Sequence, residues 1–159
     1  MKITILAVGK IKEKFYRQAV EEFEKRLSRY CKLEIIEVAD EKTPDCASQI
    51  EMDKIKEREG GRLRKYIPEG AWLCALAIDG VMLDSVELSQ KLEHLGITGK
   101  SHLIFVIGGS LGLSDAILNL ADFKLSFSKM TFPHQLMRVI LLEQIYRSYR
   151  IMAGAPYHK

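Results

Sequence analysis

LSFSKMTFPHQLMRVILLEQIYRSYRIM, from Leu125 to Met152, joins a short apolar run to the longest helical pattern in the chain. The apolar run predicts a strand over Phe123–Phe127. Apolar residues then recur at helical spacing over Pro133–Met152, and proline is favoured in the first turn of a helix. The connecting stretch Ser126–Pro133 is mixed in character. A strand followed by a loop and a helix is the unit from which α/β folds are built.

The rest of the chain repeats this alternation. Trp72–Ile78 is continuously apolar, which is typical of a strand buried on both faces. The other predicted strands are Ile3–Val8, Leu33–Val38 and Leu103–Ile107, and the other predicted helices are Phe15–Leu27, Ile50–Tyr66, Asp84–Leu95 and a short one capped by Ser114. This order predicts an α/β fold with a mostly parallel sheet and helices on both faces. No linker or repeat interrupts it, so we expect residues 1–159 to form a single domain.

The composition excludes a disordered chain but identifies no activity, because 47% of the residues are hydrophobic and 28% are charged. Lysine and arginine number 24 against 21 acids, and a net charge of +3 is too small to indicate a nucleic-acid partner. Cys31, Cys46 and Cys74 are widely spaced, which indicates a reducing compartment without a zinc site or a disulfide framework. The apolar runs are too short for a signal peptide or a membrane span. We therefore expect a cytoplasmic protein that uses no metal and contacts no membrane.

Three predicted strands end in residues of unusual chemistry. In open α/β sheets, ligands bind beyond the carboxyl ends of the strands. These ends are Ile78-Asp79-Gly80, Gly108–Gly112 and Ser126–Pro133. Paired glycines let a ligand approach the backbone closely, although a tight turn also explains them. The GGxxG pattern differs from GxGxxG and no acid follows to hold a ribose, which disfavours a dinucleotide dehydrogenase; the lack of a Walker A lysine disfavours an NTPase.

His134 and Arg138 lie one helical turn apart and share a helix face. A lone histidine is common on a helix surface, but the arginine and a neighbouring glycine loop favour a functional site. The helix that carries them is more apolar than one face of a small sheet requires. Either it is deeply buried or it forms a subunit interface, and the sequence leaves both interpretations open.

Four stretches together resemble one known family. They are MKITILAVGK (Met1–Lys10), FVIGGSLGL (Phe105–Leu113), LSFSKMTFPHQLMRVILLEQIYRSYRI (Leu125–Ile151) and the terminal PYHK (Pro156–Lys159). These stretches closely resemble the SPOUT methyltransferases that modify pseudouridine at N3 in 23S ribosomal RNA. The resemblance covers essentially the whole chain. The SKMTFPHQ run and the YHK end are its most specific parts, whereas the glycine loop alone is not specific.

This resemblance implies methyl transfer from S-adenosylmethionine to N3 of a pseudouridine in 23S rRNA within assembled 70S ribosomes. It also implies a homodimer, a C-terminal deep trefoil knot that holds the cofactor, and a tail that completes the active site of the other subunit. The implied cofactor-binding residues are Leu76, Gly108, Phe127, Ser128, Lys129, Met130, Thr131 and Phe132. The implied substrate-site and catalytic residues are His134, Arg138, Arg147, Tyr157 and His158. The chain departs from the family pattern at Ala77 and at Ser110-Leu111, where backbone groups are expected to make the contacts.

These residue types suit an in-line methyl transfer to a weakly acidic imide nitrogen. Arg138 or Arg147 would stabilise the developing negative oxygen, and His134 or His158 would orient the base or accept the proton. Tyr157 would stack on an extruded base. The sequence does not rank the two histidines. It also leaves open a SPOUT methyltransferase acting on another RNA, such as transfer RNA, and a ribosome-associated protein that has lost catalysis.

Overall fold

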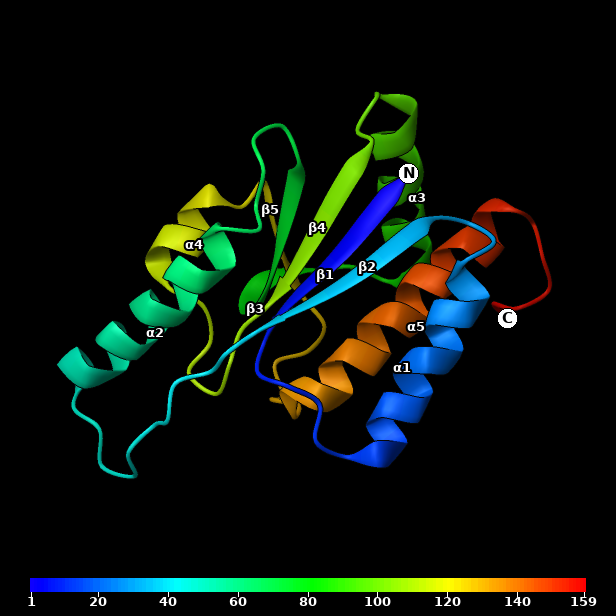
Figure 1. The fold of residues 1–159 in the computed structure, drawn as a ribbon. Helices are drawn as coiled ribbons and strands as arrows, with labels where there is room; N and C mark the ends of the chain where they lie inside the picture. The colour runs from blue at the N-terminus through cyan, green and yellow to red at the C-terminus, as the bar shows by residue number, and fades with distance from the viewer.

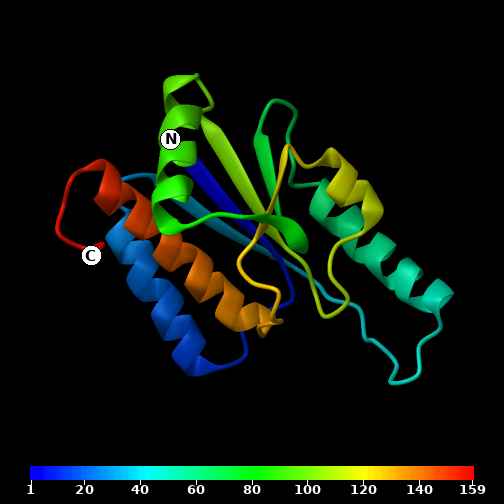
Figure 2. The same ribbon diagram turned by 180° about the vertical axis from the view of Figure 1, so that it is seen from behind.

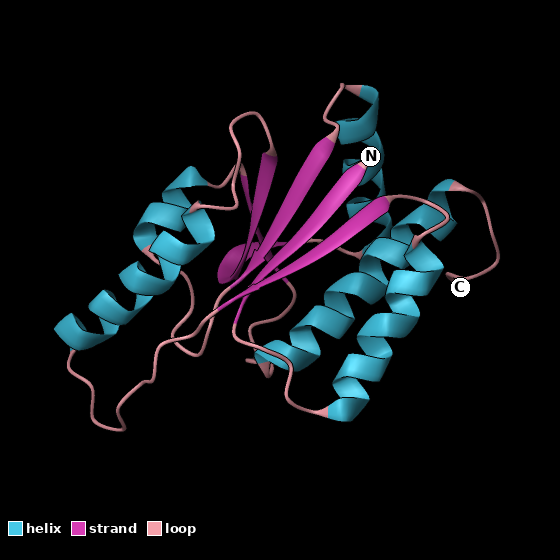
Figure 3. Ribbon diagram, viewed as in Figure 1, coloured by secondary structure: helices cyan, strands magenta, loops and turns pink.

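A computed structural model describes residues 1–159 and contains five strands that alternate with five helices (Figures 1 and 3). The strands are β1 (Lys2–Val8), β2 (Lys32–Val38), β3 (Trp72–Met82), β4 (His102–Ile107) and β5 (Phe123–Ser126). The helices are α1 (Lys14–Leu27), α2 (Gln49–Arg64), α3 (Ser85–Ile97), α4 (Asp115–Leu120) and α5 (His134–Met152). Every predicted strand and helix is present. Their bounds agree closely with the predicted ones, except at the end of β3.

The five strands form one parallel sheet in the order β2-β1-β4-β3-β5. In β1, Ile5 is in register with Ile35 of β2 on one side and with Phe105 of β4 on the other. Helices α1, α3 and α5 cover one face of the sheet, and α2 and α4 cover the other (Figures 1 and 2). The predicted parallel sheet with helices on both faces is therefore confirmed.

Alternate residues of the central strands enter two separate cores, because successive side chains of a strand point to opposite faces. Ile5 belongs to the larger core, beneath α1, α3 and α5, whereas Leu6 belongs to the smaller one beneath α2 and α4. From α5, Leu141 and Ile145 are fully buried in the larger core, each contributing about 1.5–3 kcal/mol. One face of α5 is thus a buried helix face, and its other face stays partly exposed.

Side-chain caps determine where the helices near the sheet edge begin. The Ser114 hydroxyl accepts a hydrogen bond from the backbone N–H of Ile117 and starts α4, as predicted. At the start of α3, Asp84 and Glu87 each accept from the other's backbone N–H, which forms a capping box. Pro133 stands immediately before α5. These caps fix the point at which each loop turns back over the sheet.

The prediction that β3 ends at Ile78 was wrong, because the strand continues to Met82. Both Leu76 and Val81 are in register with Leu125 of β5, so the residues between them bulge out of the ladder. Gly80 permits this path, since a Cβ there would lie 2.7 Å from the carbonyl oxygen of Lys124. An Asp-Gly pair is typical of a turn, but here Gly80 allows β3 and β5 to approach each other closely.

No helix is both long enough and apolar enough to cross a lipid bilayer. All three cysteines are free thiols, and Cys74 is fully buried. Histidine, cysteine and acidic side chains nowhere gather in a group that could hold a metal ion.

Candidate active site

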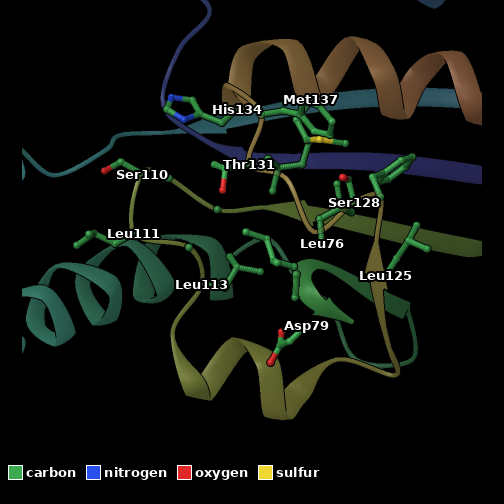
Figure 4. Close-up of a pocket in the computed structure, with 18 of the residues that line it drawn as sticks. Leu76, Asp79, Ser110, Leu111, Leu113, Leu125, Ser128, Thr131, His134 and Met137 are labelled. Atoms are coloured by element: carbon green, nitrogen blue, oxygen red, sulfur yellow. The ribbon is translucent and has the colours of Figure 1, made fainter. Parts of the chain in front are cut away.

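A cavity of about 740 Å³ opens beside the bulge of β3 and beyond the ends of β4 and β5 (Figure 4). The three strand ends singled out in the sequence meet there, so their predicted convergence is confirmed. Its lining comprises Leu76, Ala77, Ile78, Asp79, Ile107, Gly108, Gly109, Ser110, Leu111, Gly112, Leu113, Leu118, Leu125, Phe127, Ser128, Met130, Thr131, Phe132, Pro133, His134 and Met137. A cavity of this size, mostly apolar with a few polar groups, is suited to a small organic ligand.

The glycine loop, residues 108–112, is a tight turn that leaves no room for a side chain at its start. A Cβ on Gly108 would lie 2.7 Å from the carbonyl carbon of Gly112. The N–H of Gly112 donates to the carbonyl of Gly109 at 3.1 Å, and Gly112 has a φ of +85°, a conformation that L side chains rarely adopt. The loop therefore presents backbone to the cavity, as its glycines require.

The segment from Ser126 to Pro133 forms the opposite wall and is held by its own hydrogen bonds. The Ser126 hydroxyl donates to the carbonyl of Ser128 at 3.2 Å, and the Ser128 hydroxyl accepts from the N–H of Met130 at 2.9 Å. Met130 is 74% exposed at the cavity rim. These local bonds fix the backbone of a segment that has no strand partner after Ser126.

Seven of the eight expected cofactor residues line the cavity: Leu76, Gly108, Phe127, Ser128, Met130, Thr131 and Phe132. Lys129 does not, and it is exposed to solvent. The contact of these residues with a cofactor remains a prediction. Asp79 is the only charged acid in the lining and lies across the cavity from His134 (Figure 4).

His134 belongs to the first turn of α5 and lies at the edge of the cavity (Figure 4). Burial lowers the pKa of its imidazole below 6.5, and the positive charge of Arg138 lowers it further. The imidazole is therefore neutral at pH 7. A neutral imidazole offers one nitrogen that can accept a proton or a hydrogen bond.

Arg138 follows one turn later but lies behind the cavity wall and does not line it. Its side chain is 1% exposed, pairs with the carboxylate of Glu37, and donates to the carbonyls of Gly9 at 2.6 Å and Val8 at 3.2 Å. Burial lowers the pKa of this guanidinium, whereas the bond to Glu37 opposes that shift. Arg138 thus ties α5 to the ends of β1 and β2.

Arg147, Tyr157 and His158 form a separate cluster at the other end of α5. Glu143 pairs with Arg147 at 2.5 Å and accepts a hydrogen bond from the Tyr157 hydroxyl at 3.1 Å. The Arg147 guanidinium lies 4.7 Å from the centre of the Tyr157 ring and 3.3 Å from Nδ1 of His158. Arg147 stands thirteen positions after His134 on the same helix, a rise of roughly 20 Å. A single chain therefore does not bring the five expected catalytic residues together.

Sequence reasoning missed five apolar side chains of the lining: Ile107, Leu113, Leu118, Leu125 and Met137. Leu118 comes from α4 and Met137 from α5. Apolar residues at helical spacing look the same in a sequence whether they face a core or a cavity. No signal in the chain could have distinguished them.

The fold and cavity define an α/β protein whose loops at the carboxyl edge of a parallel sheet enclose a cavity of the size of a small organic molecule. A family model described as "Predicted SPOUT methyltransferase" matches residues 1–158. The chain belongs to this SPOUT methyltransferase family, which confirms the family expected from its motifs.

Relatives named "Ribosomal RNA large subunit methyltransferase H" match the chain over its full length and theirs. The relative from Clostridium kluyveri is 62% identical over 159 residues, covering all of both chains. Those from Bifidobacterium adolescentis and Clostridium tetani are 61% and 60% identical, again over all of both chains.

Proposed function

We propose that the chain transfers a methyl group from S-adenosylmethionine to N3 of a pseudouridine in 23S ribosomal RNA, acting on assembled 70S ribosomes. The observation that carries the proposal is the cavity between the glycine loop and Ser126–Pro133 in a chain of the methyltransferase family. The relatives named for methylation of large-subunit ribosomal RNA support the substrate class.

The cavity suits S-adenosylmethionine. Its apolar side chains, Leu76, Leu113 and Leu125 among them, offer a surface for the adenine ring. The backbone of the glycine loop and of Ser126–Pro133 offers N–H and C=O groups to the polar atoms of the cofactor. No side chain covers this backbone at Gly108, where there is no room for a Cβ. When bound, the cofactor supplies a methyl group activated by an adjacent sulfonium.

The chain's own residues then prepare the nucleophile. N3 of the base must lose its proton and approach the methyl carbon from the side opposite to sulfur, so that the N–C bond forms as the S–C bond breaks. We propose that neutral His134 accepts this proton, because it lines the cavity and its lowered pKa keeps it unprotonated at pH 7. The negative charge that develops on the ring oxygens needs a cation nearby.

We propose that this cation comes from a second copy of the chain in a homodimer. Within one protomer Arg147 lies roughly 20 Å from His134 along α5, and Arg138 is occupied by Glu37 and two backbone carbonyls. If the partly exposed face of α5 pairs with its counterpart, Arg147, Tyr157 and His158 of the partner subunit reach the cavity. One face of α5 would then be buried against the sheet and the other would form the subunit interface. Both interpretations that the sequence left open would apply to this helix.

We also infer that the C-terminal part of the chain is threaded as a deep trefoil knot. β5 lies at the sheet edge beside β3, whereas α5 packs against α1 and α3 on one face of the sheet. The segment Phe127–Pro133 must therefore cross from the edge strand to that face. We assign this crossing, which forms a cavity wall, to the threaded part of the knot.

Incubation of the purified chain with tritiated S-adenosylmethionine and 70S ribosomes from a strain that lacks its own enzyme tests the proposal. We expect label at a pseudouridine of 23S ribosomal RNA. Label in purified transfer RNA, and none in ribosomes, would contradict the ribosomal substrate and favour another RNA. Calorimetric binding of the cofactor without label in any RNA would instead favour a binding protein that has lost catalysis.

A further inference from the structure

Glu59, in the last turns of α2, is a buried acid, and no cation is in direct contact with its carboxyl group. The residue is 4% exposed, and glutamate is almost never fully buried unless it is paired. Its Oε2 accepts a hydrogen bond from the backbone N–H of Glu41 at 2.9 Å, while Oε1 is buried without any partner. The nearby cation, Arg62, pairs instead with the Glu41 carboxylate at 3.0 Å and donates to the carbonyl of Ala39 at 2.8 Å.

The carboxyl group of Glu59 lies directly against the glycine loop. A Cβ placed on Gly109 would be 3.2 Å from both carboxyl oxygens, so those oxygens lie beside the face of Gly109 where a side chain would stand. The next residue of α2, Gly60, packs against the cap of α4, because a Cβ on it would be 2.6 Å from the hydroxyl of Ser114. Two consecutive residues of one helix therefore pack against the glycine loop and against the helix start that follows it.

The surroundings of Glu59 favour its neutral, protonated form. Burial raises the pKa of the carboxyl group above its ordinary value, and the charges of Asp40 and Glu41 act in the same direction. The hydrogen bond from Glu41 and the charge of Arg62 oppose that rise in pKa. An ionised carboxylate here would leave a charge with an unpartnered oxygen inside the protein, which is costly.

We propose that Glu59 is a positioning residue that acts through Gly109 and holds the glycine loop in the conformation that binds the methyl donor. This inference rests on the proposed use of S-adenosylmethionine. Glu59 does not line the cavity and touches no reacting atom. Glu59 acts on the backbone of Gly108–Gly112. The glycines of this loop let that backbone approach the ligand closely.

Isothermal titration of S-adenosylmethionine into the full-length protein tests this role with three variants. Glu59→Gln keeps the shape of the neutral acid, and we expect it to bind as the unchanged protein does. Glu59→Asp withdraws the carboxyl group from Gly109 by one methylene, and Glu59→Ala removes it. We expect both to weaken binding by about tenfold, the order of loss when a supporting contact of a site is removed. Glu57→Ala, on the exposed side of the same helix, is the matched control.

Two further readouts separate positioning from mere stability. Amide hydrogen exchange in residues 108–113 should quicken in Glu59→Asp and Glu59→Ala but not in Glu59→Gln, at temperatures where all variants are folded. Cofactor affinity of the unchanged protein should fall as the pH rises through the pKa of Glu59, while that of Glu59→Gln stays level. The KM for ribosomes should not change in any of the four variants.

Normal cofactor affinity in Glu59→Asp, or in a folded Glu59→Ala, would overturn the inference and leave the proposed function intact. Equal weakening in Glu59→Gln and Glu59→Ala would show that the carboxylate itself is needed, and would overturn the neutral-acid role. If the unchanged protein does not bind S-adenosylmethionine at all, the proposed function fails, and this inference fails with it.

Discussion

At the scale of single residues, Gly108 is a position where one added methyl group would disrupt the cavity. A Cβ there would meet the carbonyl carbon of Gly112 at 2.7 Å, so Gly108→Ala must push the loop out of place. We expect a loss of about 1–3 kcal/mol of stability, as for other overpacked sites, and cofactor affinity too weak to measure by calorimetry.

Gly61→Ala is the matched control for this substitution. Gly61 lies in α2 with nothing within 4 Å of a Cβ, so alanine should stabilise the helix by roughly 0.5–1 kcal/mol and leave binding unchanged. Urea unfolding and titration calorimetry measure both effects. Tight cofactor binding by Gly108→Ala would contradict the placement of the ligand against this loop.

His134 gives a second prediction, on the pH dependence of methyl transfer. Because burial and Arg138 lower the pKa of His134 below 6.5, its neutral form dominates at pH 7 and is lost as the pH falls through the lowered pKa. Turnover at saturating ribosomes should therefore decline on the acid side of pH 6.5. His134→Gln should lack this decline and turn over about a hundredfold more slowly, as expected when a general base is removed.

His94→Gln, at an exposed position of α3, should keep the acid-side decline. An unchanged profile in His134→Gln would transfer the proton-accepting role to another group. His158 of the partner subunit would then be the next candidate.

At the scale of secondary-structure elements, Arg138 fixes α5 to the sheet. It satisfies the Glu37 carboxylate and two carbonyls of β1 and its following turn, and it is itself buried. Glu37 is partly exposed to water, but the carbonyls of Val8 and Gly9 lose a buried donor, so Arg138→Ala should lower the unfolding free energy by about 1–3 kcal/mol. Arg26→Ala breaks the exposed pair with Glu22 and should lower the unfolding free energy far less, because water screens that pair.

Urea denaturation of both arginine variants checks this comparison. If Arg138→Ala lowers the unfolding free energy by less than about 1 kcal/mol, which is the range of exposed ion pairs, the guanidinium is not needed for stability in its buried position. It would then be available to the substrate, as the sequence had suggested.

The sequence predicts elements better than it predicts contacts between them. Continuous apolar runs and the Ser114 cap suffice to place the strands and α4, because both depend on neighbouring residues. The burial of Arg138 depends on Glu37, which is 101 positions away, so its partner could not be identified from a local pattern. The extension of β3 depends likewise on the approach of Gly80 to β5, which becomes visible only when the two strands pair.

At the scale of the whole molecule, the gap between His134 and the cluster around Arg147 predicts a site shared between subunits. A variant with a disrupted cavity, Gly108→Ala, and one with a disrupted tail, His158→Ala together with Tyr157→Ala, should each be inactive alone. In a refolded equal mixture, half of the dimers contain both chains and have one complete site. Activity should then return to about a quarter of the unchanged level, as closed two-fold symmetry requires.

Light scattering after size exclusion should give twice the chain's mass of 18.1 kDa for both variants and for their mixture. Mixtures that stay inactive while remaining dimeric would mean that each protomer completes its own site. Activity in the tail variant alone would remove Tyr157 and His158 from the catalytic set.

The cavity wall from Phe127 to His134 and the whole of α5 lie in the C-terminal fifth of the chain. During synthesis the N-terminal strands emerge first and can begin to fold, whereas these residues are made last. The cavity therefore forms only when translation of the chain is nearly complete, and the tail follows it. A truncated translation product would possess much of the sheet and no site, so an interrupted chain cannot capture the methyl donor.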